Sequence, residues 1–130
     1  MNLIVFTVEA KKLNYAETRE FYIDKLKFFP KEGTENPLIN PKYPCAAIWI
    51  SATKKNRQKE ESHISFFLEK NIASYCNNIK KLGVDIELVT DMCETTYVAS
   101  FNDPSGNVIT VHCDTIEDDF GETFEVLIAD

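Results

Sequence analysis

The sequence predicts an α+β fold made of two βαβββ modules, and three observations support this prediction. A β-rich stretch, "LIVFTV", is followed by a helical pattern, a turn-rich region and a second β-rich stretch, "CAAIWISA". After ten polar residues without periodicity, "TKKNRQKEES", the same order of patterns begins again. Three alternating segments complete this repeat, so we expect modules at residues 1–52 and 63–113, joined by a linker at 53–62.

The first helix is expected within "LNYAETREFYIDKLKFF". Asn14 is a suitable N-cap, and Glu17 follows three residues later, as in a capping box. Tyr22 and Leu26 then recur at helical spacing, and Pro30 stops the pattern.

The second module is expected to begin with the strand "HISFFLE" and the helix "NIASYCNNIKKLG". Asn71 would cap this helix, and Gly83 would end it where a positive φ is commonly required. The segments "VDIELVTD", "TTYVASFN" and "NVITVHCD" are predicted strands, and the last two are joined by an Asp-Pro-Ser-Gly turn.

The net charge of −7 is concentrated at the C-terminus. Residues 114–130 hold seven acidic residues and no basic one, so the preceding residues balance 14 acids against 14 bases. We expect a solvated acidic extension here and, because the body has no basic stripe, no nucleic-acid partner.

The remaining composition points to a cytoplasmic protein with free thiols. No apolar run reaches the roughly 20 residues that cross a bilayer, so no membrane partner is expected. The start "MNLIVFTVEA" lacks the features of a signal peptide. The four cysteines are widely spaced without a CxxC pair, which disfavours a zinc ribbon or a redox motif.

Three segments carry a resemblance to a known family: "REFYIDKLKFFP", "HISFFLEKNIASYCNNIKKLGV" and "FNDPSGNVITV". They are similar to the vicinal oxygen chelate superfamily, which includes glyoxalases, bleomycin resistance proteins and extradiol dioxygenases. The resemblance covers residues 1–113 and implies two modules in an open, barrel-like mixed sheet around a pocket, in a homodimer. One departure is Lys27, which stands where the first helix of the family usually ends in glycine. Either this residue is strained, at a cost of about 1 kcal/mol, or the helix ends differently.

Strand alternation divides the predicted strands into two faces. The apolar face should pack under the helices and comprises Ile4, Phe6, Val8, Ile48, Ile50, Ile64, Phe66, Leu68, Ile109 and Val111. The opposite face mixes apolar and polar residues, and it carries both histidines of the chain, His63 and His112. A mixed surface with aromatic side chains is typical of a small-molecule pocket.

The resemblance also gives an expectation about metals. Metal-dependent members bind a divalent ion with His and Glu from the first and last strand of each module, and these positions correspond to Leu3, Trp49, His63 and Thr110. Only His63 is a ligand of the required type, so we expect no metal and no cofactor. A shifted site that uses both His63 and His112 remains an alternative.

The leading hypothesis is therefore metal-free binding of a small molecule, antibiotic-like or a metabolite, with an aromatic or cationic character. The predicted ligand-binding residues are Trp49, His63, Ser65, Phe67, Tyr97, Phe101, Thr110 and His112. The alternative is a glyoxalase-type lyase or isomerase, or a related enzyme, in which His63 is the catalytic residue at a non-standard metal site. A third hypothesis is an interaction domain whose segment "TFEVLIA" docks as an edge strand on a partner or a second subunit.

Overall fold

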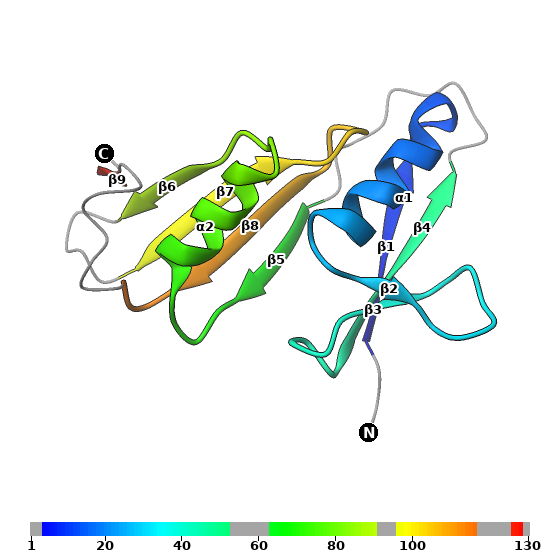
Figure 1. The fold of residues 1–130 in the computed structure, drawn as a ribbon, viewed down its shortest axis with the longest axis horizontal. Helices are drawn as coiled ribbons and strands as arrows, with labels where there is room; N and C mark the ends of the chain where they lie inside the picture. The colour runs from blue at the N-terminus through cyan, green and yellow to red at the C-terminus, as the bar shows by residue number, and fades with distance from the viewer. Residues whose placement is uncertain (1–3, 53–62, 91–95, 117–125, 129–130) are drawn as a thin grey trace. The chain divides into compact units, whose positions relative to one another are not determined.

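The computed structural model describes residues 4–52, 63–90, 96–116 and 126–128 (Figure 1). The chain divides into two compact units, which we describe separately. Unit 1 contains residues 1–62 together with Asp103–Asn107, and unit 2 contains residues 63–102 and 108–130. The five residues at 103–107 are thus grouped with the first module, although they lie within the second module in sequence.

Unit 1 contains one helix and a four-stranded sheet (Figure 1). The strands are β1 (Ile4–Ala10), β2 (Phe29–Pro30), β3 (Leu38–Ile39) and β4 (Ala46–Ala52); a short 3₁₀ turn (Lys12–Asn14) precedes α1 (Tyr15–Asp24). The strand order is β1-β4-β3-β2. β1 runs parallel to β4, and the other pairs are antiparallel.

Unit 2 repeats this arrangement and adds one strand (Figure 1). Its elements are β5 (His63–Phe67), α2 (Ile72–Lys81), β6 (Glu87–Thr90), β7 (Tyr97–Asn102), β8 (Val108–Cys113) and β9 (Val126–Ile128). The strand order is β5-β8-β7-β6-β9, with β5 parallel to β8. The shared order of the first four strands confirms the prediction of an α+β fold with two βαβββ modules and open mixed sheets.

The additional strand β9 comes from the acidic extension. It runs parallel to β6, and its three residues pair with Leu88–Thr90 of the same chain. The third hypothesis assigned "TFEVLIA" to a partner or a second subunit, but its three described residues extend the chain's own sheet in this structure.

The two helices cover the apolar faces that alternation predicts. α1 buries Thr18, Phe21 and Tyr22, while α2 buries Ile72, Ala73, Cys76 and Ile79. The sheet residues that are buried on these sides include Val8, Ile48, Ile50, Ile64, Phe66, Ile109 and Val111. Neither of the described helices is long and apolar enough to cross a membrane.

The first half of β1 departs from this pattern. Ile4 and Phe6 were expected in the core, but they are 60% and 39% exposed, whereas Val8 is fully buried. β1 is an outer strand of its sheet. The ten residues of α1 extend only about 15 Å, so burial on β1 is confined to its second half.

The helix ends agree only in part with the sequence prediction. Asn14 occupies the N-cap position but makes no capping bond to the backbone; its amide donates to the Glu17 carboxylate at 3.2 Å. Lys27 has a φ of +63°, which is the left-handed conformation of the first of its two alternatives. Gly83 has a φ of +89° after α2, as predicted.

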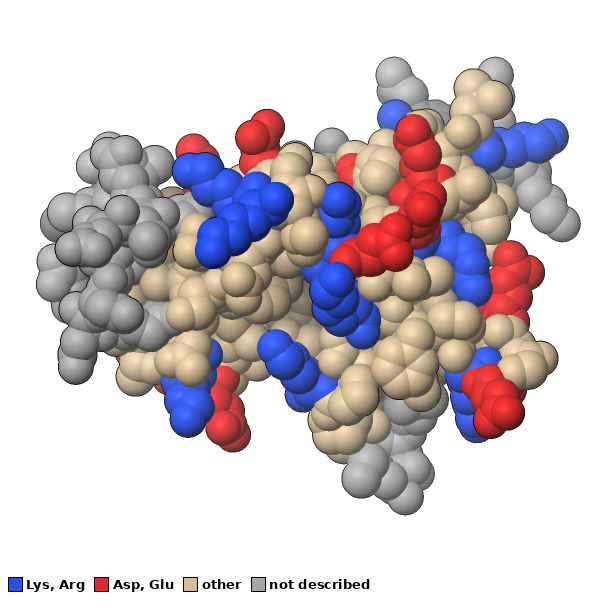
Figure 2. Space-filling model, in the orientation of Figure 1, with Lys and Arg blue, Asp and Glu red and all other residues tan. Residues whose placement is uncertain are grey.

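Basic and acidic side chains are mixed on the surface seen in Figure 2. Lysine side chains gather over α2, which has Lys80 and Lys81 in its last turn. Positive charge at this end complements the helix dipole.

Candidate functional site

The face of the second sheet that points away from α2 carries both histidines, and we call it the histidine face. A polar row crosses it from strand to strand. Ser65 is paired with Thr110, Thr110 with Ser100, and Ser100 with Glu87. The Ser65 and Thr110 hydroxyl oxygens are 2.8 Å apart, so they share a hydrogen bond. The row thus offers three hydroxyls and one carboxylate to a ligand.

The histidines lie on opposite sides of this row. His63 is paired with Val108, and His112 is paired with Phe67, which is 59% exposed. Val108 and His112 are four residues apart on β8, which corresponds to about 13 Å along the strand. The two imidazoles of one chain therefore do not converge on one ion, because zinc–nitrogen bonds are about 2.1 Å long.

The positions carried over from the metal-dependent relatives do not form a metal site either. The strand partner of Thr110 is Ser65, not His63, so the row at this position contains hydroxyl groups. Trp49 offers no lone pair to a cation, and Leu3 lies outside the described residues. These residues do not fit a divalent ion of the family type.

The other predicted ligand-binding residues fall into two groups. Ser65, Phe67 and Thr110 share the histidine face with His63 and His112. Trp49 lies in unit 1, paired with Thr7 on the sheet face away from α1, and is 44% exposed.

Tyr97 and Phe101 lie on the opposite side of the second sheet. Phe101 is paired with Ile109 and Tyr97 with Cys113, which places both on the face that packs against α2. Phe101 is only 3% exposed. These two aromatic rings are therefore not available for stacking on the histidine face, and the structure separates them from the other predicted residues.

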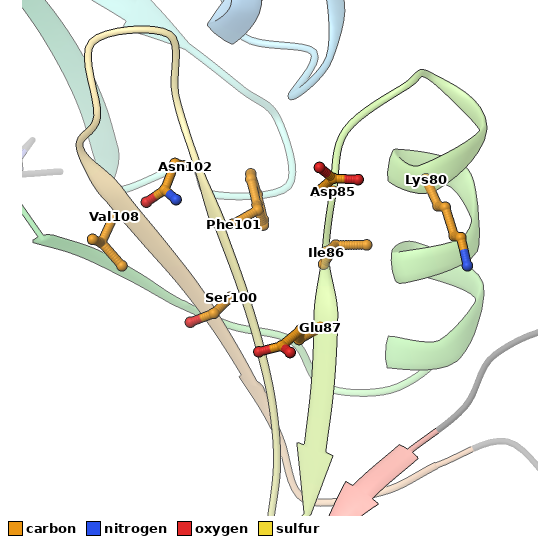
Figure 3. Close-up of a pocket in the computed structure, with 8 residues that line it drawn as sticks. All are labelled: Lys80, Asp85, Ile86, Glu87, Ser100, Phe101, Asn102 and Val108. Atoms are coloured by element: carbon orange, nitrogen blue, oxygen red, sulfur yellow. The ribbon is translucent and has the colours of Figure 1, made fainter.

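A cavity of about 520 Å³ opens where the pairing of β6 and β7 begins (Figure 3). Its lining residues are Lys80, Asp85, Ile86, Glu87, Ser100, Phe101, Asn102 and Val108. Pairing starts at Glu87 and Ser100, so the preceding Asp85 and Ile86 have no partner on β7. In Figure 3 the Glu87 carboxylate points toward Ser100.

The cavity is continuous with the histidine face. Glu87, Ser100, Asn102 and Val108 all lie on this face, since each is paired directly with another member of it. The apolar part of the lining consists of Ile86, Phe101 and Val108, and the polar part consists of two carboxylates, one ammonium, one hydroxyl and one amide. This composition suits a small organic molecule with an apolar body and polar substituents.

Sequence reasoning did not identify Asp85, Glu87, Ser100 or Asn102 as site residues. Alternation along β7 places Ser100 and Asn102 on one face, but only the pairing with β8 shows that this face is the one with the histidines. The sequence feature that could have indicated their position is the length of the turn between β7 and β8, because this length sets the register of the two strands.

The structure contains a four-strand unit whose first strand pairs in parallel with the strand that follows the other two in sequence, and this unit occurs twice along the chain. This repetition defines a class of paired βαβββ proteins. A family model described as glyoxalase/bleomycin resistance protein/dioxygenase superfamily matches residues 13–111. The chain belongs to this superfamily.

Solved structures with this fold include proteins of different kinds. An integron cassette protein from the mobile metagenome of the Halifax Harbour sewage outfall is 21% identical, with a TM-score of 0.70 over 86% of this chain and 97% of its own. An antibiotic-binding protein from a Streptomyces species is 16% identical, with a TM-score of 0.66 over 88% and 97%. A lactoylglutathione lyase from Agrobacterium tumefaciens is 13% identical, with a TM-score of 0.62 over 85% and 92%. No curated protein matches the sequence.

Proposed function

We propose that this chain binds a small organic molecule on the histidine face of unit 2, without a metal ion, and that the cavity of Figure 3 holds part of the ligand. The observation that carries this proposal is the continuity between the cavity and the face with both histidines. The volume of about 520 Å³ lies within the range of ligand pockets, which is about 300–1,000 Å³.

The side chains around the cavity favour a ligand with a protonated nitrogen. Asp85 and Glu87 offer two carboxylates against the single ammonium of Lys80. Phe67, which is exposed on the histidine face and paired with His112, can stack on an aromatic group. The fold is shared with an antibiotic-binding protein, which supports small-molecule binding for this scaffold.

Three aromatic probes of the same size test this proposal. Benzamidine, benzamide and benzoate, which are cationic, neutral and anionic, are titrated into ¹⁵N-labelled protein and followed by amide chemical shifts. We expect saturable shifts at Ser100, Asn102 and Val108, with benzamidine bound most tightly. Shifts that do not saturate, or that map to other residues, would refute the proposal.

A matched pair of variants tests the role of the carboxylate. Glu87→Gln should weaken benzamidine binding about fivefold, which corresponds to about 1 kcal/mol for a solvent-exposed charged pair, and should leave benzamide binding unchanged. Glu69→Gln makes the same substitution at an exposed residue outside the cavity lining. It should not affect either probe.

We propose further that the chain forms a homodimer through the outer strand β1. Ile4, Val5 and Phe6 are consecutive residues of this strand and are 60%, 46% and 39% exposed. An apolar outer strand readily pairs with another chain.

The Val5→Lys substitution tests this role of β1, because it should shift the sedimentation coefficient to that of a monomer. Leu13→Lys, at an apolar residue that is 97% exposed outside the strands, is the control. Identical sedimentation of all three proteins would contradict this role of β1.

A further inference from the structure

The turn at Asp103–Asn107, which we call the Asp103 turn, is held in unit 1 by a buried hydrogen-bond network. The Tyr22 hydroxyl donates to Asp103 Oδ2 at 2.8 Å. The hydroxyl oxygens of Thr18 and Ser105 are 2.6 Å apart, and Asn107 Nδ2 donates to the Glu9 carbonyl at 3.0 Å. Helix α1 and the end of β1 therefore fix the turn through side chains.

The turn is also rigid internally. Asp103 Oδ1 accepts the backbone N–H groups of Ser105 and Asn107, both at 2.9 Å, and Asp103 Oδ2 accepts Asn107 Nδ2 at 2.8 Å. The backbone N–H of Asp103 donates to the Asn107 carbonyl at 3.0 Å, which closes the turn at its base. Asp103 and Asn107 are almost completely buried, at 5% and 1% exposure. A buried network in which the carboxylate is fully used gives the turn one defined geometry.

The two residues that flank the Asp103 turn line the cavity. Asn102 is the last residue of β7, Val108 is the first residue of β8, and the two are paired. Each is joined to the turn by a single peptide bond, so a change in the backbone of the turn passes directly to these two residues.

We propose that Tyr22 and Thr18 are positioning residues for the ligand-binding cavity: they hold the Asp103 turn, and the turn holds Asn102 and Val108 in the cavity wall. This inference rests on the proposed function, because it assigns a role in that same site. Neither Tyr22 nor Thr18 lines the cavity.

The Tyr22 hydroxyl remains a donor over the whole neutral pH range. Burial, followed by the negative charge and the hydrogen bond of Asp103, raises the pKa of Tyr22 far above its ordinary value of 10.0.

Two substitutions in the ¹⁵N-labelled full chain test the proposal. Tyr22→Phe removes the hydroxyl and retains the ring, and Thr18→Val removes the other hydroxyl at nearly constant volume. Both should move the amide resonances of Asn102 and Val108, including the Asn102 side-chain amide. Both should weaken benzamidine binding about fivefold, the equivalent of about one hydrogen bond.

Two control variants separate positioning from a general effect on stability. Tyr15→Phe makes the same change on the same helix, but the Tyr15 hydroxyl bonds to Glu35 at 3.1 Å and not to the turn. Thr18→Ser retains the hydroxyl opposite Ser105. Both controls should keep the wild-type resonances of Asn102 and Val108 and the wild-type affinity for benzamidine.

The outcomes distinguish this inference from the proposed function. Unmoved Asn102 and Val108 resonances in both Tyr22→Phe and Thr18→Val would overturn the positioning role, whatever the affinity. A failure of Thr18→Ser to restore the wild-type resonances would also overturn it. If wild-type protein does not bind benzamidine, the small-molecule proposal is wrong for this probe class, and the resonances alone decide whether the turn positions the wall.

Discussion

The left-handed backbone conformation of Lys27, which follows α1, leads to a quantitative prediction about the free energy of unfolding. Lys27 has a φ of +63°, a conformation that costs a residue with a Cβ about 1–2 kcal/mol and glycine almost nothing. Two effects oppose the gain from Lys27→Gly. Glycine has more freedom in the unfolded chain, which costs about 0.5 kcal/mol, and the exposed bond from Lys27 Nζ to the Asp24 carbonyl, 2.7 Å long, is lost at a cost of about 0.3 kcal/mol.

The net expectation is that Lys27→Gly raises the free energy of unfolding by about 0.5–1 kcal/mol. Urea denaturation measures this as an increase in the midpoint at constant m-value. Lys27→Asn should fall between glycine and lysine, because asparagine tolerates this conformation better than most residues.

The end of α2 provides the reciprocal experiment. Gly83 has a φ of +89°, and a Cβ added there would meet no atom of the described residues within 4 Å, its chain neighbours aside. Gly83→Ala should therefore lower the free energy of unfolding by about 1 kcal/mol through conformation alone. If Lys27→Gly destabilised the protein while Gly83→Ala had no effect, the reasoning from backbone strain would be refuted.

Three further predictions concern pH, the core and the C-terminal strand. The pKa of Tyr22 is raised in the folded state, so the stability that its protonated form contributes is complete below about pH 10 and is lost as the pH rises toward the folded-state pKa. The free energy of unfolding of the wild type should therefore fall with pH above 10. Tyr22→Phe should make this fall less steep by up to about 1.4 kcal/mol per pH unit. Phe101→Ala should lower the free energy of unfolding by about 3–4 kcal/mol, whereas Phe67→Ala should lower it by less than about 1 kcal/mol, because only Phe101 is buried; equal losses in urea denaturation would contradict the assigned faces. Deletion of residues 126–130 should speed amide exchange at Leu88–Thr90, which pair with β9, without changing the oligomeric state. A change from dimer to monomer would instead indicate that the strand joins two copies.

The sequence was sufficient for the fold because its signals are local. The alternation in "HISFF" and "VITVHC" correctly separates His63 and Thr110 from Ile64 and Ile109, and the glycine expected at the position of Lys27 indicates the positive φ found there. These signals need no knowledge of which strands are neighbours.

The cavity depends on contacts that no local signal reports. Phe101 was predicted to bind ligand as an aromatic residue that could stack on it, but the register across the Asp103 turn pairs it with Ile109 in the core. The cavity itself exists because β6 and β7 stop pairing at Glu87 and Ser100. Ile4 and Phe6 were predicted to be buried, and they are exposed because the extent of α1 over β1 is a tertiary property.

The Asp103 turn also affects the order in which the parts of this protein can complete their folding during synthesis. Tyr22 and Thr18 are buried against partners that follow 81 and 87 residues later in the chain. While the ribosome has released only the first module, these two hydroxyls have no native partner, and the packing of α1 cannot be completed. The first module to be made is therefore among the last parts to reach its final state, and a nascent chain stalled before residue 103 would present an unfinished first module to chaperones and proteases.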